Sequence, residues 1–148
     1  MPQNLRFLLS FIFLSLIILS IFNLSILDNK ILIKNKIINQ TPITIFEPEK
    51  DKKNKNLIVI AHGFAGSSSF MKPIALSLAN TGYKTVTFDF LGHGRHSQAY
   101  SGNILDEKGA TKLFVKQTEN LIDYFLDKNN EHKAIIIGHS MASDIIFR

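Results

Sequence analysis

The sequence has no cysteine among its 148 residues. This absence excludes disulfides, a thiol nucleophile, thiolate metal sites and a lipid anchor attached to cysteine. No internal repeat is visible either. Apolar residues make up 45% of the chain and charged residues 20%, which is typical of a folded protein rather than a disordered one. The length allows one modest domain with one buried core.

Basic residues outnumber acidic residues by 17 to 12, and the resulting net charge of +5 raises the question of nucleic-acid binding. The distribution of the lysines argues against nucleic-acid binding. Much of the excess falls into two groups, which are Lys30, Lys34 and Lys36, and then Lys50, Lys52, Lys53 and Lys55. Both groups are interleaved with Asn and Asp rather than with aromatic residues. We therefore expect a solvated linker or contacts with anionic lipid head groups, and no nucleic-acid partner.

Residues 5–27 form an almost continuous apolar run in which Arg6 is the only charge. About 20 apolar residues are enough to cross a bilayer as a helix. A cleaved signal peptide would need a shorter apolar run followed by a small-residue cleavage site, and no such site follows. A buried core helix would show a polar face, which this segment lacks. We therefore expect an uncleaved membrane anchor, in the inner membrane of a bacterium.

The charges beside this run do not decide the side of the membrane. Lysines follow the span, which favours a cytoplasmic position for the remainder of the chain. A signal-anchor function would instead place the remainder outside.

The chain is expected to divide into three parts: a membrane or signal anchor (1–28), a β-hairpin with a charged linker (29–56), and a partial α/β core (57–148). Within the second part, Ile31–Ile33 and Ile43–Phe46 are predicted to form two antiparallel edge strands. A charged connector follows at Glu49–Asn56.

Strands then alternate with helices along the chain. Strands are predicted at Leu57–Ala61, Lys84–Phe88 and Ala134–Ile137, all buried, and helices at Ser67–Asn80, Glu107–Lys128 and from Ser140 onward. The predicted inner faces of the first two helices are Met71, Ile74, Ala75 and Leu78, and Leu113, Gln117, Leu121, Tyr124 and Phe125. This alternation is typical of an α/β fold with a mostly parallel sheet.

The segment Gly138-His139-Ser140-Met141-Ala142 follows the last strand directly. A nucleophile on a sharp strand-to-helix turn needs small residues two positions to either side. Gly138 meets this requirement, and Ala142 stands where glycine is usual. Ser140 is therefore the candidate nucleophile, and the positive end of the next helix favours developing negative charge. The alternative is an ordinary turn in which Ser140 caps the helix.

The segment His62-Gly63-Phe64-Ala65-Gly66-Ser67 follows the first buried strand. An acyl-transfer site needs two N–H donors directed at the oxyanion. We expect one from Met141, the residue after the nucleophile, and the other from Phe64 in this loop. Gly63 would let the backbone approach the substrate closely. His62 is expected to support the loop rather than to act as a base.

The segment Asp89–Ser97 (DFLGHGRHS) follows the strand Lys84–Phe88. Asp89, His93 and Ser97 are expected to brace this loop rather than to react. A metal site on His93 and His96 lacks a third ligand at suitable spacing, so no metal is expected.

The motifs HGFAGS, DFLGHGRHS and GHSMA, in this order at strand ends, resemble the α/β-hydrolase superfamily over about Ile43 to Arg148. They are most similar to its monoacylglycerol-lipase-like and serine-aminopeptidase-like branch. The resemblance implies Ser140 as nucleophile, Phe64 and Met141 as backbone oxyanion donors, ester, thioester or amide substrates, small or lipid, and no cofactor. It disfavours the aspartate nucleophile of dehalogenases and epoxide hydrolases.

The acid and base of a catalytic triad are missing from the sequence. In this fold they follow the serine along the chain, but only Asp144 follows Ser140, one helical turn later, and all five histidines precede it. Without a base, serine is a weak nucleophile. The strand Ala134–Ile137 would also have a bare apolar edge. We therefore expect the chain to represent the N-terminal half of a hydrolase, poorly folded and inactive by itself.

Two functional hypotheses remain open at this point. The first is a membrane-anchored serine hydrolase that forms an acyl-enzyme on Ser140. The second is a non-catalytic remnant or pseudo-enzyme at the membrane. A third interpretation, a lysine-rich binder of membrane surfaces, would not depend on Ser140. Apolar side chains at Phe64, Phe70 and Leu91 favour an acyl or aromatic group near the site.

Overall fold

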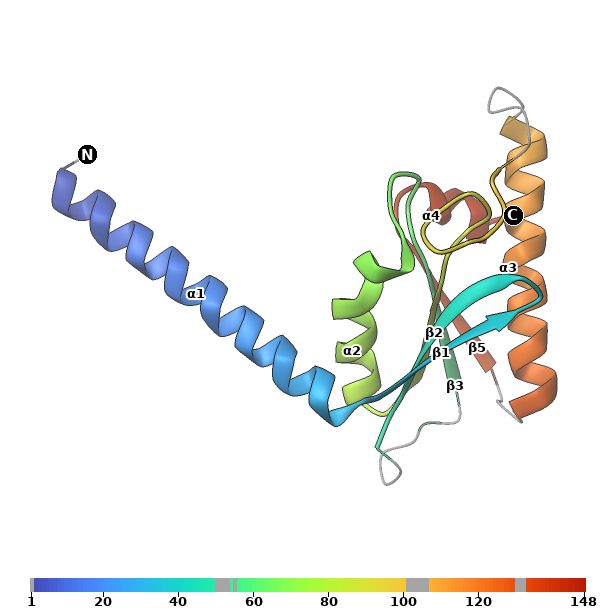
Figure 1. The fold of residues 1–148 in the computed structure, drawn as a ribbon, viewed down its shortest axis with the longest axis horizontal. Coiled ribbons are helices and arrows are strands. Elements are labelled where there is room, and N and C mark those ends of the chain that lie inside the picture. The colour runs from blue at the N-terminus through green and yellow to red at the C-terminus, as the bar shows by residue number, and fades with distance from the viewer. Residues whose placement is uncertain (1, 50–53, 55, 101–106, 130–132) are drawn as a thin grey trace.

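The computed structural model describes residues 2–49, 54, 56–100, 107–129 and 133–148. The predicted apolar run lies in one long helix, α1 (Gln3–Lys30), which extends away from the rest of the molecule (Figure 1). Its stretch Gln3–Ile26 has a mean hydropathy of 2.6 and is not buried against the protein. The helix is thus long and apolar enough to cross a membrane, and a signal sequence would share both properties.

A β-hairpin follows α1 directly. Strand β1 (Leu32–Ile38) pairs antiparallel with β2 (Thr41–Glu47) through a two-residue turn, in which Asn39 and Gln40 have φ angles of 47° and 67°. Such turns need positive φ at both positions and match the twist of the strands. The predicted pairing is confirmed, but the strands are longer than expected, and β2 is not an edge strand because its other side pairs with β4. The expected connector Glu49–Asn56 lies mostly outside the described residues, and Asn56 already begins β3.

Five strands form one mixed sheet in the order β1-β2-β4-β3-β5. The inner strands are β3 (Asn56–Ala61) and β4 (Lys84–Phe88), which pair in parallel, and β5 (Lys133–Gly138) pairs in parallel with β3. Because β2 is antiparallel to both of its neighbours, it runs against the other four described strands. The sheet was expected to be mostly parallel, but it is mixed, because the pairs β1–β2 and β2–β4 are antiparallel and only β4–β3 and β3–β5 are parallel.

Strand β5 is an outer strand of the described sheet. Its residue Ile135 is 42% exposed, so the prediction of a strand is confirmed and the prediction of full burial is wrong. The reason is that the described chain places no strand beyond it, so that one edge and part of each face meet solvent.

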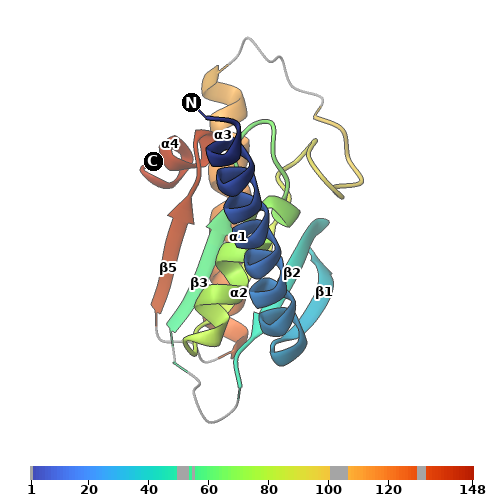
Figure 2. The same cartoon turned by 90° about the vertical axis from the view of Figure 1, so that its left-hand side faces the viewer.

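Helices cover both faces of the sheet (Figures 1 and 2). The short 3₁₀ turn η2 (Ser68–Met71) and helix α2 (Lys72–Asn80) lie on one face, and α3 (Glu107–Asn129) lies on the other. Alternating residues of β3 divide between the two layers, since Leu57 and Val59 pack toward α3 whereas Ile58 and Ile60 pack toward α2. This alternation is the period-two pattern of a strand buried on both faces.

The predicted inner faces of the two long helical segments are confirmed in part, at Met71 and Ala75 and at Leu121 and Phe125. Met71 in η2 and Ala75, Leu76 and Ala79 in α2 are buried, whereas Ile74 is 46% exposed and Leu78 is only partly buried. Along α3 the buried residues are Phe114, Thr118, Leu121 and Phe125, whereas Leu113 is 48% exposed. In the first case the segment opens with a 3₁₀ turn of about 3.0 residues per turn, which changes the phase of the apolar stripe. In the second, the stripe starts one residue later, at Phe114.

Candidate active site

Ser140 occupies a strained backbone conformation between β5 and the short helix α4 (Met141–Ile146). Its φ is 56° and its ψ is −120°, a region that is costly for a residue with a Cβ atom. The Ser140 side chain makes no capping hydrogen bond to α4, although the residue occupies the N-cap position. The residue is exposed to solvent. The capping alternative therefore does not account for this serine, and its hydroxyl is free to meet another molecule.

The turn around Ser140 depends on a glycine before it. A Cβ atom added to Gly138 would stand 2.6 Å from the carbonyl oxygen of Ala142, closer than a carbon atom can approach. Ala142 itself is fully buried in the core beneath the turn, so its methyl group fits where glycine is usual. The Ser143 hydroxyl donates a hydrogen bond of 3.0 Å to the Gly138 carbonyl and closes the turn.

The loop after β3 packs against this turn. A Cβ atom built on Gly63 would lie 3.0 Å from the Cβ of Ser140 and 3.2 Å from the carbonyl oxygen of His139. The His139 N–H also donates a hydrogen bond of 3.1 Å to the carbonyl of Ala61. Segment 62–67 and Ser140 are thus neighbours, as an oxyanion loop and its nucleophile must be. The donor roles of the Phe64 and Met141 N–H groups stay predictions.

His62 lies completely buried at the start of this loop. Its Nδ1 is 2.7 Å from the Gly63 carbonyl oxygen, and its Nε2 accepts a hydrogen bond of 3.1 Å from the Phe90 N–H. An imidazole that donates at one nitrogen and accepts at the other is neutral. Burial lowers the pKa of His62, which keeps the ring in that form. The ring thereby connects the loop after β3 to the loop after β4.

Asp89 makes a second connection between the same loops. Its buried carboxylate accepts hydrogen bonds from the Ser68 N–H (2.6 Å), the Arg95 N–H (3.2 Å) and the Arg95 Nε (3.2 Å). Burial alone would raise the pKa of Asp89, but the hydrogen bonds from Ser68 and Arg95 together outweigh it and hold this pKa below its usual value. The carboxylate is therefore charged, paired and occupied with structural contacts.

Arg95 extends this connection to the hairpin. Its guanidinium donates hydrogen bonds to Asn35 Oδ1 at 3.0 Å, to Thr44 Oγ1 at 2.9 Å and to Ser68 Oγ at 3.2 Å. One side chain thus joins β1, β2, η2 and the end of β4. The role of Arg95 cannot be predicted from the sequence, because its partners on the hairpin lie 51 and 60 residues away along the chain and no local pattern indicates them.

His93 lies near the site without reaching the nucleophile. Its Nδ1 is 3.0 Å from the Leu91 carbonyl oxygen, and its ring lies 5.7 Å from the ring of Phe64. Ser97, expected beside it as a brace, is exposed. Within the described ranges no hydrogen bond reaches the Ser140 hydroxyl, and no group of three or more His, Asp or Glu residues is placed to hold a metal ion.

A cavity of about 570 Å³ is lined by Met141, the residue after Ser140, and carries Asp144 and Arg148 at its wall, whereas Ser140 itself does not line it. Its lining includes Phe64, His93, Tyr100, Phe114, Met141 and Ile145, so its walls are mainly apolar. A volume of this order suits a small organic ligand. Phe64 was expected to lie near an acyl or aromatic group, and it lines this cavity. Leu91 lines a second, smaller pocket instead. Phe70 is 72% exposed and lines neither pocket.

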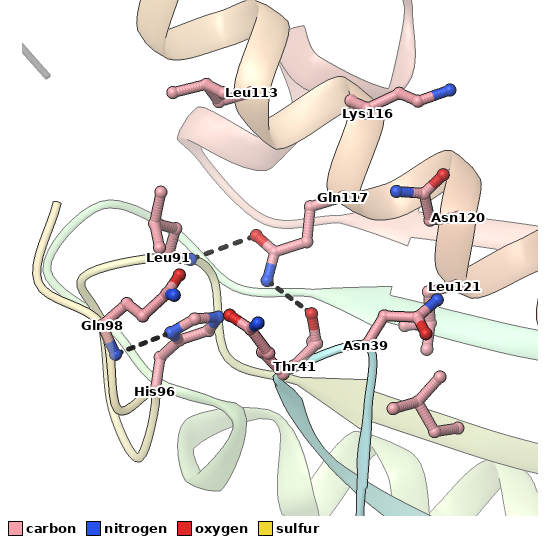
Figure 3. Close-up of a pocket in the computed structure, with 12 residues that line it drawn as sticks. Asn39, Thr41, Leu91, His96, Gln98, Leu113, Lys116, Gln117, Asn120 and Leu121 are labelled. Atoms are coloured by element: carbon pink, nitrogen blue, oxygen red, sulfur yellow. Dashed lines mark hydrogen bonds between the residues drawn. The ribbon is translucent and has the colours of Figure 1, made fainter. Parts of the chain in front are cut away.

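That second pocket, of about 190 Å³, lies between the hairpin turn and α3 (Figure 3). Gln117 occupies its inner side, where the amide accepts from the Leu91 N–H at 3.1 Å and donates to Thr41 Oγ1 at 2.9 Å (Figure 3). Gln117, predicted at helical spacing with Leu113 and Leu121, therefore connects α3 to the sheet through polar contacts. The pocket includes neither Ser140 nor its neighbours.

The chain resembles known proteins in its sequence family and in its fold. A family model described as "Serine aminopeptidase, S33" matches residues 52–148. No curated protein sequence matches the chain. Among solved structures, a Thermus thermophilus protein is similar with a TM-score of 0.65 and 15% identity, over 78% of this chain and 49% of its own.

Two further structures carry descriptive names. A lipase in its open form is similar with a TM-score of 0.61 and 18% identity, over 78% of this chain and 38% of its own. A serine hydrolase without a lid from Xanthomonas campestris has a TM-score of 0.59 and 16% identity, over 80% of this chain and 55% of its own. At these identities the likeness concerns the fold. The chain spans between 38 and 55% of the length of these three structures.

Proposed function

Because this chain belongs to the serine aminopeptidase family of α/β-hydrolases, we propose that it is a serine hydrolase sequence whose nucleophile is Ser140. The family and the fold are those of hydrolases in general. The more specific proposal is that the Ser140 hydroxyl attacks the carbonyl carbon of an ester or amide and forms an acyl-enzyme.

The main support for this proposal is the backbone conformation of Ser140. Ser140 has the strained φ of 56°, no capping hydrogen bond and an exposed position beside Gly63. A strained backbone persists only where the surrounding structure enforces it, and such residues cluster at active sites. A serine that served only to cap α4 would need neither the strain nor the neighbouring loop.

The proposed reaction begins with addition of Ser140 Oγ to the substrate carbonyl carbon while a base takes the hydroxyl proton. The carbonyl oxygen becomes an oxyanion, which the N–H groups of Phe64 and Met141 would stabilise. Collapse of this intermediate breaks the bond between the carbonyl carbon and the leaving group, which takes up the proton held by the base and departs as alcohol or amine. Water then hydrolyses the acyl-enzyme, which gives a carboxylic acid and restores the Ser140 hydroxyl. The apolar walls of the 570 Å³ cavity favour an acyl or aromatic substituent. No step requires a cofactor.

The described residues provide Ser140 with no hydrogen-bonded base. Serine without a base is a weak nucleophile at neutral pH, and oxyanion stabilisation with binding alone retains only about 10³–10⁴-fold catalysis over water. We therefore propose that these 148 residues by themselves react slowly at Ser140. The same observation favours a second candidate function, namely a non-catalytic protein that holds an acyl ligand in the cavity.

We further propose that α1 anchors the protein in a membrane. The support is its 24-residue apolar stretch, Gln3–Ile26, of which no residue in the spanning window is buried inside the protein. A helix of this length extends about 36 Å, enough for a hydrocarbon core of about 30 Å.

A fluorophosphonate probe tests the role of Ser140. The full chain in detergent is incubated with the probe over a range of pH, and labelled peptides are mapped by mass spectrometry. We expect slow labelling that is specific to Ser140 and is abolished in Ser140→Ala. Labelling should accelerate with pH, because the described residues provide no hydrogen-bonded base and hydroxide takes that part. Absence of Ser140 labelling at alkaline pH would reject the nucleophile. Fast labelling at neutral pH would show that a base is present after all.

A further inference from the structure

Helix α1 rises toward the end of the molecule that carries the candidate site. From its junction with β1, it runs upward on the side of α2, and both views place the N-terminus toward the end where the loop after β3 and α4 lie (Figures 1 and 2). The base of α1 is attached to the domain, since α1 contacts α2 and Leu24 packs against the core cluster that contains Ile31 and Ala75. A membrane that holds α1 would therefore lie on the site's side of the domain.

Apolar side chains are exposed on the elements nearest to this position. Phe64 in the loop after β3 is 62% exposed, Phe70 in η2 is 72% exposed and Ile74 in α2 is 46% exposed. We refer to these three residues as the loop–α2 face. Ile74 was predicted on the inner face of α2, but Ala75, Leu76 and Ala79 pack that helix against the sheet and leave Ile74 on the outer side. Phenylalanine and isoleucine on a surface beside a candidate membrane helix suit the boundary of a bilayer.

Charge separates this side of the molecule from the opposite one. Residues 57–88, which include the loop, η2 and α2, contain no Asp or Glu, and their only Lys or Arg residues are Lys72 and Lys84. Helix α3 on the other side carries eight charged residues of both signs among its 23. A segment without carboxylates avoids repulsion from the negative surface of anionic lipids, whereas the mixed charge of α3 suits water.

We propose that the loop–α2 face rests on the surface of the lipid bilayer that holds α1. This inference relies on the membrane anchor proposed above, and it does not rely on catalysis. Because Phe64 also lines the 570 Å³ cavity, contact of this face with lipid brings the cavity to the membrane surface. The protein would thus contact the bilayer in two places, through α1 inside it and through the loop–α2 face on its surface.

The absence of tryptophan from the chain permits a direct test. Phe70→Trp introduces a single fluorophore on the proposed face, and Ile74→Trp introduces it one turn further along. Leu113→Trp is the matched control, because Leu113 is a similarly exposed apolar residue on α3. Each full-length variant is reconstituted in vesicles of phosphatidylcholine and phosphatidylglycerol that contain brominated phosphatidylcholine, and helix content is compared by circular dichroism.

We expect brominated lipid to quench Trp at positions 70 and 74, and acrylamide in the water to quench them roughly threefold less than Trp at position 113, because an interfacial side chain is shielded from water. If both variants respond to acrylamide as the control does, while the protein still floats with the vesicles, the face is in water and the inference is wrong although the anchor stands. A chain that does not float with vesicles overturns the anchor and the inference together. Neither result bears on the labelling of Ser140.

Discussion

Gly63 lies in van der Waals contact range of Ser140, with only 3.0 Å between the Ser140 Cβ and the position that a Gly63 Cβ would take. The two residues come from different strand ends, after β3 and after β5, and they meet because the strands pair in parallel with Ala61 opposite Gly138. The parallel register therefore brings the proposed oxyanion loop to the proposed nucleophile.

Gly63→Ala should disturb this contact with little change in stability. The new methyl group would press on the Ser140 Cβ and on the His139 carbonyl oxygen, so that the loop shifts away from the nucleophile. Loss of one oxyanion donor costs about 10²–10³ in rate, so we expect labelling of Ser140 by a fluorophosphonate to fall by about tenfold or more. Ala65→Ser, at an exposed position of the same loop, is the control and should keep its labelling rate. Equal rates in both variants would contradict the proposed role of the loop.

Gly138→Ala should damage the turn itself. Its Cβ would meet the Ala142 carbonyl oxygen at 2.6 Å, and because that neighbour is backbone it cannot rotate aside. We expect a loss of about 1–3 kcal/mol in the free energy of unfolding, the usual range for overpacking, together with loss of Ser140 labelling. The comparison is Ala142→Gly, which restores the more usual motif and should cost about 1 kcal/mol while labelling persists. A fully stable Gly138→Ala variant would show that the turn tolerates a side chain.

The strands and the strand-to-helix turn could be predicted because their signals are local. Leu57–Ala61 is a continuous apolar run, and such runs form buried strands wherever the sheet places them. Gly138 and Ala142 flank Ser140 at the spacing that a sharp turn requires, and the structure has this turn at the same residues. Neither inference needed knowledge of distant contacts.

The helix faces and the polar ties could not be predicted in the same way. An apolar side chain such as Ile74 or Leu113 fits an inner stripe by spacing alone, yet which stripe faces the sheet depends on where the helix begins and what it packs against. The contacts of Arg95 with Asn35 and Thr44 depend on three segments that meet only in the folded chain. Local motifs therefore indicate the candidate nucleophile Ser140, but they do not indicate residues such as Arg95 that hold the site loops in place.

Arg95→Ala should weaken the junction between the hairpin and the site loops. Asp89 would keep its two backbone donors but lose the guanidinium, and Asn35 and Thr44 would lose a partner. Hydrogen bonds to charged groups contribute about 1.5–3 kcal/mol, so we expect a loss in this range by urea unfolding in detergent. Lys116→Ala removes an exposed ion pair with Glu119 (3.9 Å) and should cost at most about 1 kcal/mol. Equal losses in the two variants would contradict the structural role of Arg95.

Acid should destabilise the folded domain through His62 before it affects Asp89. Burial lowers the pKa of His62 in the folded chain below 6.5, the ordinary value that applies in the unfolded chain. At a pH between the folded and the unfolded pKa, the unfolded chain binds a proton that the folded chain does not. The free energy of unfolding therefore falls as the pH drops below about 6.5. The slope is at most about 1.4 kcal/mol per pH unit for one group. The pKa of Asp89 is lowered from 3.8, so its contribution to stability is lost only below about pH 3.8, as the pH falls through the lowered pKa of the folded chain.

Urea unfolding in detergent from about pH 8 to about pH 5 measures how the free energy of unfolding changes with pH. His62→Gln provides the comparison, because its amide can donate and accept hydrogen bonds but does not titrate. We expect His62→Gln to be less stable at about pH 8 and to have a smaller slope below about pH 6.5; an unchanged slope would assign the acid sensitivity to other groups.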